Sequence, residues 1–304
     1  MQEAKRNGCE IVMFILGNQN DQFYSKIKQF GDVKVKDGLR TQCITGNNVK
    51  RANKQLIGNL LLKINAKMCG TNSIVNDPNG TVLFKTPTIV IGADVTHPAP
   101  GDNEKPSIAA ICASLDANAS TYHAAVRVQA HRQETIGSKS STKSAHLKDM
   151  VGECLTKFLV NTKGQKPAHI IYYRDGISEG QFAPVLEDEL TQIRQACHAK
   201  HESYKPKITF IVVTKRHHTR LFCKNTRDAE GKAGNVPAGT VVDRVIVHPE
   251  WNDFYLCSHN GIQGTSKPAK YTVLYNDFEE FKKSPDVLQS LTYSVLKLIA
   301  ILTK

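Results

Sequence analysis

The sequence has no long apolar run, no paired cysteine motif and almost no tryptophan. No window approaches the ~18 continuous apolar residues that a membrane-spanning helix needs, so we expect no membrane association. The eight cysteines are spread singly, without a Cys-x-x-Cys pair. This spacing fits neither a disulfide framework nor a zinc knuckle, and it predicts reduced thiols without disulfide partners. A single tryptophan argues against a sugar-binding or membrane-interface surface.

Acidic residues are also scarce relative to basic ones. The 304 residues include 40 Lys and Arg against 28 Asp and Glu, a formal net charge of +12. Such a balance favours a polyanionic partner, either nucleic acid or an anionic membrane surface. The hydrophobic fraction of 40% is enough for a folded core and excludes a disordered chain. The length fits two domains, or one large α/β domain with an appendage.

The positive charge is concentrated near the start of the chain. Residues 26–67 contain ten basic residues and only two acidic ones, Asp32 and Asp37. A solvated helix face usually mixes both signs, so this segment indicates more than solubility. A charge run alone is still typical of an exposed surface, and a binding site needs a second feature beside it.

The first part of the sequence predicts a small α/β unit. We expect a strand over 11–16, a helix over 22–30, a loop over 41–44 and a helix over about 49–67. Residues 77–80 (DPNG) are a strong turn signal, so we place a domain boundary at residue 80.

The second part predicts a sheet that begins with three consecutive strands, followed by a helix and a strand. This is the opening order of a ribonuclease H-like sheet. The expected strands cover 88–93, 107–115, 121–128, 169–173, 208–213, 240–248, 254–258 and 271–275. The expected helices cover 145–161 and 184–200, and a last helix follows Ser284 as its cap with Pro285 in its first turn.

Asp94 and Asp175 each follow a buried-type strand. In open α/β sheets, ligands bind at the carboxyl ends of the strands. Two carboxylates that meet there repel each other unless a cation lies between them, and their oxygens suit Mg²⁺ or Mn²⁺. A pair of such ions can promote phosphodiester cleavage. For either aspartate alone, a turn or cap residue is the more common interpretation.

Four longer motifs favour a functional role for these aspartates over the turn or cap interpretation. They are residues 92–98 (GADVTHP), 173–182 (YRDGISEGQF), 215–222 (KRHHTRLF) and 258–266 (SHNGIQGTS). In this order they resemble the active-site and guide-contacting motifs of the Argonaute family, in its eukaryotic Argonaute subgroup. The resemblance runs from about residue 20 to about residue 292. It implies an α/β fold: a ribonuclease H-like PIWI domain over 81–304, preceded over 1–80 by the C-terminal part of a Rossmann-like Mid domain.

The resemblance also implies catalytic residues. Asp94 and Asp175 match two metal-binding members of the family's catalytic tetrad, with Mg²⁺ or Mn²⁺ as the cofactor. Residues 126–134 (VRVQAHRQE) match the stretch with the mobile glutamate, which makes Glu134 the third member. The tail from Ser294 departs from the family pattern before the fourth member is reached, and no histidine follows His259. We therefore assign no fourth ligand, expect a C-terminally incomplete PIWI domain, and consider cleavage doubtful.

Two groups of residues match the family's guide-binding positions. The first corresponds to the pocket for the guide 5′-phosphate and first base: Tyr24, Lys28, Gln42, Cys43, Asn48, Lys63 and Lys67. An aromatic platform beside several cations suits a base that carries a phosphate dianion. The second group corresponds to contacts with the guide backbone: Lys215, Arg216, His218, Arg220, His259, Gln263, Ser266 and Lys267.

Three functions remain open at this point. The first is binding of a small 5′-phosphorylated guide RNA, and through it a target RNA, in gene silencing. The second is Mg²⁺-dependent endoribonuclease activity on the target. The third is a protein-interaction module, because PIWI domains of the family hold tryptophans of silencing proteins. The expected location is the cytoplasm, with the nucleus as a second compartment.

Overall fold

The computed structural model describes residues 1–17, 22–35, 38–74, 86–137, 146–231, 233–261 and 264–303. It divides into two compact units: Met1–Ser73 with Ile299–Lys304, and Ile74–Leu298. We call them unit 1 and unit 2. The predicted boundary at residue 80 lies outside the described residues, so the domain limits stay a prediction.

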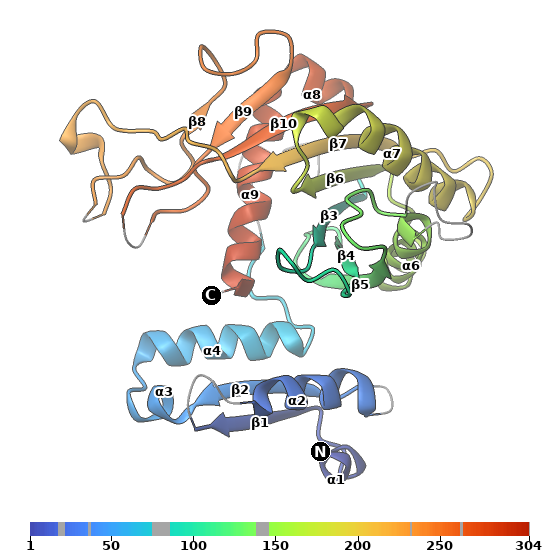
Figure 1. Ribbon diagram of the computed structural model, residues 1–304, viewed down its shortest axis with the longest axis vertical. Coiled ribbons are helices and arrows are strands. Elements are labelled where there is room, and N and C mark those ends of the chain that lie inside the picture. Colours follow the sequence, from blue (N-terminus) through green and yellow to red (C-terminus); the bar gives the residue numbers. More distant parts are fainter. Residues whose placement is uncertain are drawn as a thin grey trace. The chain divides into compact units, whose positions relative to one another are not determined.

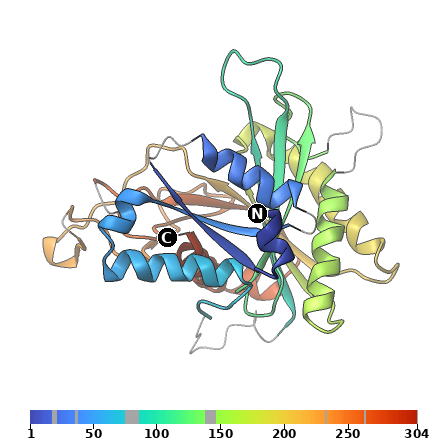
Figure 2. The same cartoon turned by 90° about the horizontal axis from the view of Figure 1, so that it is seen from below.

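Unit 1 is built on a pair of parallel strands, β1 (Ile11–Leu16) and β2 (Arg40–Thr45). Helices α2 and α4 lie against this pair in both views (Figures 1 and 2). Its helical segments are α1 (Gln2–Arg6), α2 (Phe23–Gln29), a π turn (Phe30–Lys34), α3 (Gly46–Lys50) and α4 (Lys54–Lys67).

Two expectations for unit 1 are wrong in detail. Residues 41–44 form the middle of β2 and not a loop, because they pair in register with Val12–Ile15 while Thr41 and Gln42 are buried. The helix expected over 49–67 is broken into α3 and α4. The side chain of Asn53 accepts a hydrogen bond from the Leu56 amide, which starts α4 as a new helix.

Unit 2 contains a sheet whose described strands run in the order β5-β4-β3-β6-β7-β10-β9-β8. The pairs β3–β6 and β6–β7 are parallel, and the other neighbours are antiparallel. The strands are β3 (Thr88–Thr96), β4 (Ser107–Ser114), β5 (Tyr122–Gln129), β6 (His169–Asp175), β7 (Lys207–Thr214), β8 (Val241–Val242), β9 (Asn252–Leu256) and β10 (Ala269–Asn276).

Helices cover both faces of this sheet (Figure 1). Alternate residues of a strand point to opposite faces. On β6, Arg174 bonds to Glu189 of α7, whereas Tyr173 bonds to Thr292 of α9, so α7 and α9 lie on opposite faces. The helices are α6 (His146–Asn161), α7 (Phe182–His198), α8 (Glu279–Lys283) and α9 (Pro285–Thr303), with 3₁₀ turns at Glu179–Gln181 and Thr226–Asp228.

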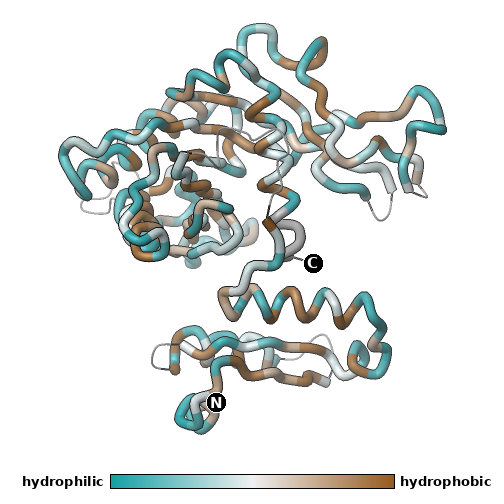
Figure 3. The backbone as a smooth tube through the Cα atoms, turned by 180° about the vertical axis from the view of Figure 1, so that it is seen from behind, coloured by the Kyte–Doolittle hydropathy of each residue, from teal (hydrophilic) through white to brown (hydrophobic). Residues whose placement is uncertain are grey.

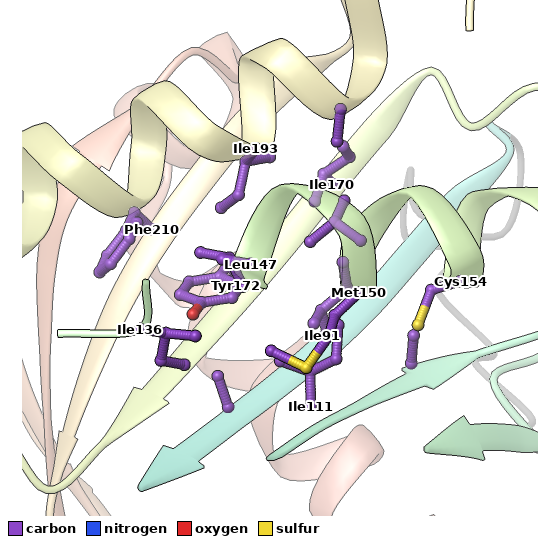
Figure 4. Close-up of a cluster of buried hydrophobic side chains, with 14 of the residues drawn as sticks. Ile91, Ile111, Ile136, Leu147, Met150, Cys154, Ile170, Tyr172, Ile193 and Phe210 are labelled. Carbon is purple, nitrogen blue, oxygen red and sulfur yellow. The ribbon is translucent and has the colours of Figure 1, made fainter. Parts of the chain in front are cut away.

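The main hydrophobic core lies between the sheet and helices α6 and α7. Figure 4 shows Leu147, Met150 and Cys154 of α6 packed over Ile91 and the neighbouring strands. Hydrophobic residues follow the strands of unit 2, and hydrophilic residues follow the surface loops (Figure 3). This arrangement confirms the expected order of three strands, a helix and a strand. No described helix is both long and apolar enough to span a bilayer.

One expected strand of unit 2 is mostly absent. Only Val241–Val242 of the segment 240–248 pairs with β9, and the following residues form an irregular loop. Val245 is 99% exposed, so the apolar residues that suggested a strand have no sheet to pack on. The expected helix over 184–200 starts two residues earlier, at Phe182.

The buried imidazole of His169 gives a test of the fold. Its ring stacks on Phe278 with 4.3 Å between centroids, and Nε2 lies 2.9 Å from Thr209 Oγ1. Burial, helped by the charge of Lys207, lowers the pKa of His169 to about 4. The folded state therefore disfavours the protonated form, and stability present above the unfolded pKa of ~6.5 is lost as pH falls toward 4.

We expect His169→Phe to reduce this pH dependence, because phenylalanine keeps the stacking on Phe278 and cannot be protonated. The wild-type chain should lose about 3 kcal/mol of unfolding free energy from this group between pH 6.5 and 4. Denaturant unfolding at several pH values measures the difference between the two proteins. Equal slopes against pH would contradict the assignment of this titration to His169.

Candidate functional site

The two strand-end aspartates are neighbours. Strands β3 and β6 are parallel, and Ala93 and Arg174 are register partners. Asp94 and Asp175 are therefore the next pair in register, on the same face of the sheet. Adjacent strands are ~4.8 Å apart, so the two carboxylates lie at one edge as the sequence predicted.

Glu134 belongs to the same edge. A β-carbon built on Gly176 would lie 3.7 Å from Asp94 Oδ1 and 3.8 Å from Glu134 Oε1. Both carboxylates thus face one small volume beside Gly176. The backbone there has φ +91°, a conformation that suits glycine. Asp94 and Glu134 are thus brought together by β3 and the segment after β5, and Asp175 follows β6 in register with Asp94.

Each carboxylate has a different environment. Glu134 Oε2 lies 2.7 Å from His97 Nε2, and its Oε1 accepts from Arg174 at 3.1 Å. Asp175 Oδ2 accepts from Lys215 Nζ at 2.5 Å. Within the described ranges, the side chain of Asp94 has no hydrogen-bond or ion-pair partner. In this arrangement, no three described His, Cys, Asp or Glu side chains converge closely enough to hold a metal ion.

The donor set nevertheless fits a divalent cation. Asp94, Asp175 and Glu134 offer carboxylate oxygens, which are the ligands that Mg²⁺ and Mn²⁺ prefer. Two of these carboxylates, those of Asp94 and Glu134, border the volume beside Gly176. Residue 176 is a glycine, so no side chain of its own fills this volume. The ammonium of Lys215, on a 65% exposed side chain, pairs with Asp175. Asp94 and Asp175 would be the first ligands, with Glu134 as a third.

Arg174 organises the interior side of this edge. Its side chain is fully buried, and it donates to the backbone oxygen of Glu134 at 2.6 Å and to the backbone oxygen of Asp175 at 2.5 Å. Its Nε donates to Glu189 at 3.1 Å. Burial acts to lower the pKa of Arg174, but the combined attraction of Glu189, Tyr172 and Glu134 outweighs it, so the pKa of Arg174 is raised. The guanidinium therefore stays charged.

A second site lies in unit 1. A cavity of about 520 Å³ is lined by five of the predicted guide-pocket residues: Tyr24, Gln42, Cys43, Asn48 and Lys63. Tyr24 comes from α2, Lys63 from α4, and the polar residues from β2 and α3. The volume is in the usual range for small-molecule sites.

The two remaining residues of that prediction, Lys28 and Lys67, do not line the cavity but bond to β2 beside it. Lys28 Nζ donates to both Thr41 O and Thr41 Oγ1 at 2.9 Å. Lys67 Nζ donates to Thr41 O at 2.8 Å and to Gln42 Oε1 at 2.6 Å. Partial burial, and then the nearby charge of Lys28, lower the pKa of Lys67. Two ammonium groups held this close, with no acidic partner in the part of the chain that the structure describes, attract an anion.

The predicted backbone-contact residues lie at or beyond the ends of β7 and β9. Lys215, Arg216 and His218 are exposed. Arg220 donates to the carbonyls of His217 and Thr219, and Ser266 Oγ accepts from the Gly261 amide, so these two also hold their own loops. His259 Nδ1 lies 2.6 Å from Ser258 Oγ, and Lys267 is exposed. Gln263 lies outside the described residues.

Sequence reasoning missed several members of both sites. The cavity of unit 1 is also lined by Thr45, Asn53, Gln55 and Asn59. At the carboxylate edge, His97 and Arg174 contact Glu134. Both stand inside the motifs at 92–98 and 173–182, Arg174 next to Asp175 and His97 three residues after Asp94, and these positions were the available signal. The polar residues of unit 1 gave no such signal, since polar side chains on a short helix are ordinary.

The sheet order and the helices on its two faces define a ribonuclease H-like fold. Residues 11–303 match the family described as Piwi domain. The chain therefore belongs to the Argonaute family of Piwi-domain proteins.

Solved structures of the family superpose on most of the chain. Kluyveromyces polysporus Argonaute with a guide RNA matches at 26% identity and a TM-score of 0.81, over 92% of this chain and 34% of its own. The C-terminal lobe of a budding yeast Argonaute matches at 27% identity and a TM-score of 0.80, over 92% of this chain and 56% of its own. Drosophila Piwi matches at 27% identity and a TM-score of 0.76, over 96% of this chain and 36% of its own. The chain thus spans between about a third and just over half of these structures.

The pairing of Lys215 with Asp175 yields a prediction. We expect Lys215→Met to strengthen Mn²⁺ binding about tenfold, because the metal then no longer competes with an ammonium for the Asp175 carboxylate. Isothermal titration with Mn²⁺ measures the effect. Lys224→Met is the matched control, since it removes the same charge from an exposed loop position. Similar affinities for both variants would show that Lys215 does not control the site.

Proposed function

We propose that this chain binds the 5′ end of a small guide RNA in the cavity of unit 1. The observation that supports this is a cavity lined by Tyr24 and Lys63, with the ammonium of Lys67 bonded to Gln42 in its lining. The aromatic ring offers a stacking surface for the first base, and Lys28 Nζ lies 5.8 Å from its centroid. The lysines supply charge for a terminal phosphate, which is close to a dianion at neutral pH.

The remaining contacts make the pocket selective for a phosphate. Lys28 and Lys67 share the carbonyl of Thr41, so their ammonium groups are fixed before a ligand binds. Fixed cations cost less conformational entropy on binding than free surface lysines. Exposed Arg216, His218 and Lys267 of unit 2 are the proposed contacts with the guide backbone. Such contacts add affinity that depends on salt and not on sequence.

Charge reversal tests the pocket. Lys63→Glu with Lys67→Glu should lower the affinity for a 5′-phosphorylated RNA ten- to a hundredfold relative to the same RNA with a 5′-hydroxyl, because charge-assisted hydrogen bonds are lost. Fluorescence anisotropy at fixed salt measures both affinities.

The matched control is Lys26→Glu with Lys34→Glu, which changes the charge of unit 1 equally at residues that do not line the cavity. This control should lower the affinities for both RNAs by the same factor, because it reduces only the general electrostatic attraction. If the pocket variant also lowers the affinities for both RNAs by the same factor, the 5′-phosphate assignment is refuted.

A second candidate function is guide-directed cleavage of a target RNA with Mg²⁺ or Mn²⁺. The register of Asp94 and Asp175, together with Glu134 beside Gly176, favours it. A divalent ion at such a site supplies Lewis-acid polarisation of a phosphodiester. In this chain, Asp94 offers a carboxylate that has no partner among the described residues, Arg174 and His97 orient Glu134, and Lys215 pairs with Asp175.

Single-turnover cleavage of a guide-matched target tests this function. We expect slow cleavage in Mg²⁺ and faster cleavage in Mn²⁺, since Mn²⁺ binds such ligands more tightly. Asp94→Asn should reduce the rate at least a hundredfold in both metals. Asp102→Asn, at a partly exposed acid in the loop between β3 and β4, is the control. Cleavage that survives in Asp94→Asn would exclude this edge as the catalytic site, and no cleavage by any variant would leave guide binding as the function.

A further inference from the structure

Helix α7 presents two buried polar side chains to the segment that carries Glu134. Glu189 is fully buried and Gln192 is 5% exposed, and they lie three residues apart, on one face of the helix. The other buried residues of α7 are apolar and belong to the hydrophobic core. Burying a carboxylate and an amide costs free energy unless each is fully hydrogen-bonded, so their contacts show what they hold.

Both side chains contact the same residue, Ile136. The Ile136 amide donates to Glu189 Oε1 at 3.2 Å, and Gln192 Nε2 donates to the Ile136 carbonyl at 2.8 Å. Ile136 is fully buried, where water is not available as a partner. A residue outside any strand or helix therefore has both backbone groups satisfied by side chains of one helix.

The same two side chains extend this contact in opposite directions. Glu189 accepts from Arg174 Nε at 3.1 Å and from Tyr172 OH at 2.9 Å, which ties it to β6. Gln192 Oε1 accepts from the amides of Leu147 at 3.2 Å and Lys148 at 3.4 Å, in the first turn of α6. The segment around Ile136 is thus fastened to β6 on one side and to α6 on the other.

Glu134 lies two residues before this anchor. Its backbone oxygen and its carboxylate both accept from Arg174, whose guanidinium is itself oriented by Glu189. A displacement of Ile136 would move the backbone of Glu134, and a displacement of Glu189 would release Arg174. The carboxylate faces Gly176 only while both anchors hold.

We propose that Glu189 and Gln192 are positioning residues that fix Glu134 at the carboxylate edge, by holding the backbone of Ile136 and the guanidinium of Arg174. Neither touches the volume beside Gly176. The inference rests on the proposed cleavage site for its functional meaning, whereas the anchoring itself is a property of the fold. A role in stability alone would make all of unit 2 less stable without a specific effect on the Glu134 segment.

The main test variant is Gln192→Leu, which keeps the approximate volume and removes both hydrogen-bonding groups. Gln195→Leu makes the same change at an exposed position of α7, and Cys197→Ala removes buried volume from α7 away from Ile136. Glu189→Gln is a second variant, which keeps an acceptor for the Ile136 amide and loses the charge opposite Arg174. Because Glu189→Gln leaves Arg174 without its buried counter-charge and can fail to fold, Gln192→Leu carries the test.

Two measurements are made on the full chain. Hydrogen exchange is followed at Ile136, Leu147 and Lys148, and Mn²⁺ affinity is titrated beside a Glu134→Ala reference. Gln192→Leu should speed exchange about fivefold to tenfold at the Leu147 and Lys148 amides, which lose their acceptor, the usual effect of losing one net hydrogen bond. The variant should also speed exchange at the Ile136 amide, which still donates to Glu189, because the Ile136 carbonyl is no longer held. It should also weaken Mn²⁺ binding by up to the factor seen for Glu134→Ala. Both control variants should change neither quantity at these positions.

The outcomes separate the inference from the proposed function. Unchanged exchange at the three amides, or an equal increase throughout unit 2, would overturn the inference. So would intact Mn²⁺ affinity in Gln192→Leu if Glu134→Ala loses it, because Glu134 would then not need the anchor. If Glu134→Ala binds Mn²⁺ normally, the proposed role of Glu134 fails, and the exchange data alone decide whether Gln192 anchors the segment.

Discussion

The buried charge of Arg174 is the constraint on which the rest of unit 2 depends. A guanidinium removed from water is tolerated only when its donors are satisfied and an opposite charge lies close. Glu189 supplies the charge, and the backbone oxygens of Glu134 and Asp175 accept the remaining donors. One side chain therefore links the end of β6, the middle of α7 and the segment after β5. Removing one partner of such a pair usually costs about 3–5 kcal/mol.

The two sites of the chain use charge in different ways. At the carboxylate edge of unit 2, the acids Glu134 and Asp175 are each held by a cation, and Asp94 is left open within the described structure. Exchange of the Lys215 ammonium for a divalent metal ion would add one positive charge, which the carboxylate of Asp94 would offset. In the cavity of unit 1, Lys28 and Lys67 are held by neutral oxygens of Thr41 and Gln42. No described acidic side chain pairs with either ammonium, so this site favours an anion.

Periodicity predicted the elements of the core well, because apolar residues there alternate or recur according to the secondary structure that buries them. Helix α6 and strands β3 and β6 are examples. It failed where an element is polar or where apolar residues remain exposed. Strand β2 contains Thr41 and Gln42, which give no strand signal until β1 pairs with them. The loop after β8 contains Val245 and Ile246, which look like a strand but find no partner.

The sequence by itself determined the family, the positions of Asp94, Asp175 and Glu134, and the aromatic and basic residues of the pocket, because these residue types stand in long motifs. Only the tertiary structure decided which of them meet. Lys215, expected at a guide phosphate, pairs with Asp175. Glu189 and Gln192 look like ordinary polar residues of a helix, yet they bond to the backbone of Ile136, which lies more than fifty residues earlier in the sequence. Spacing along a chain reports which residues share a face, whereas contacts across a core depend on how the helices pack on the sheet.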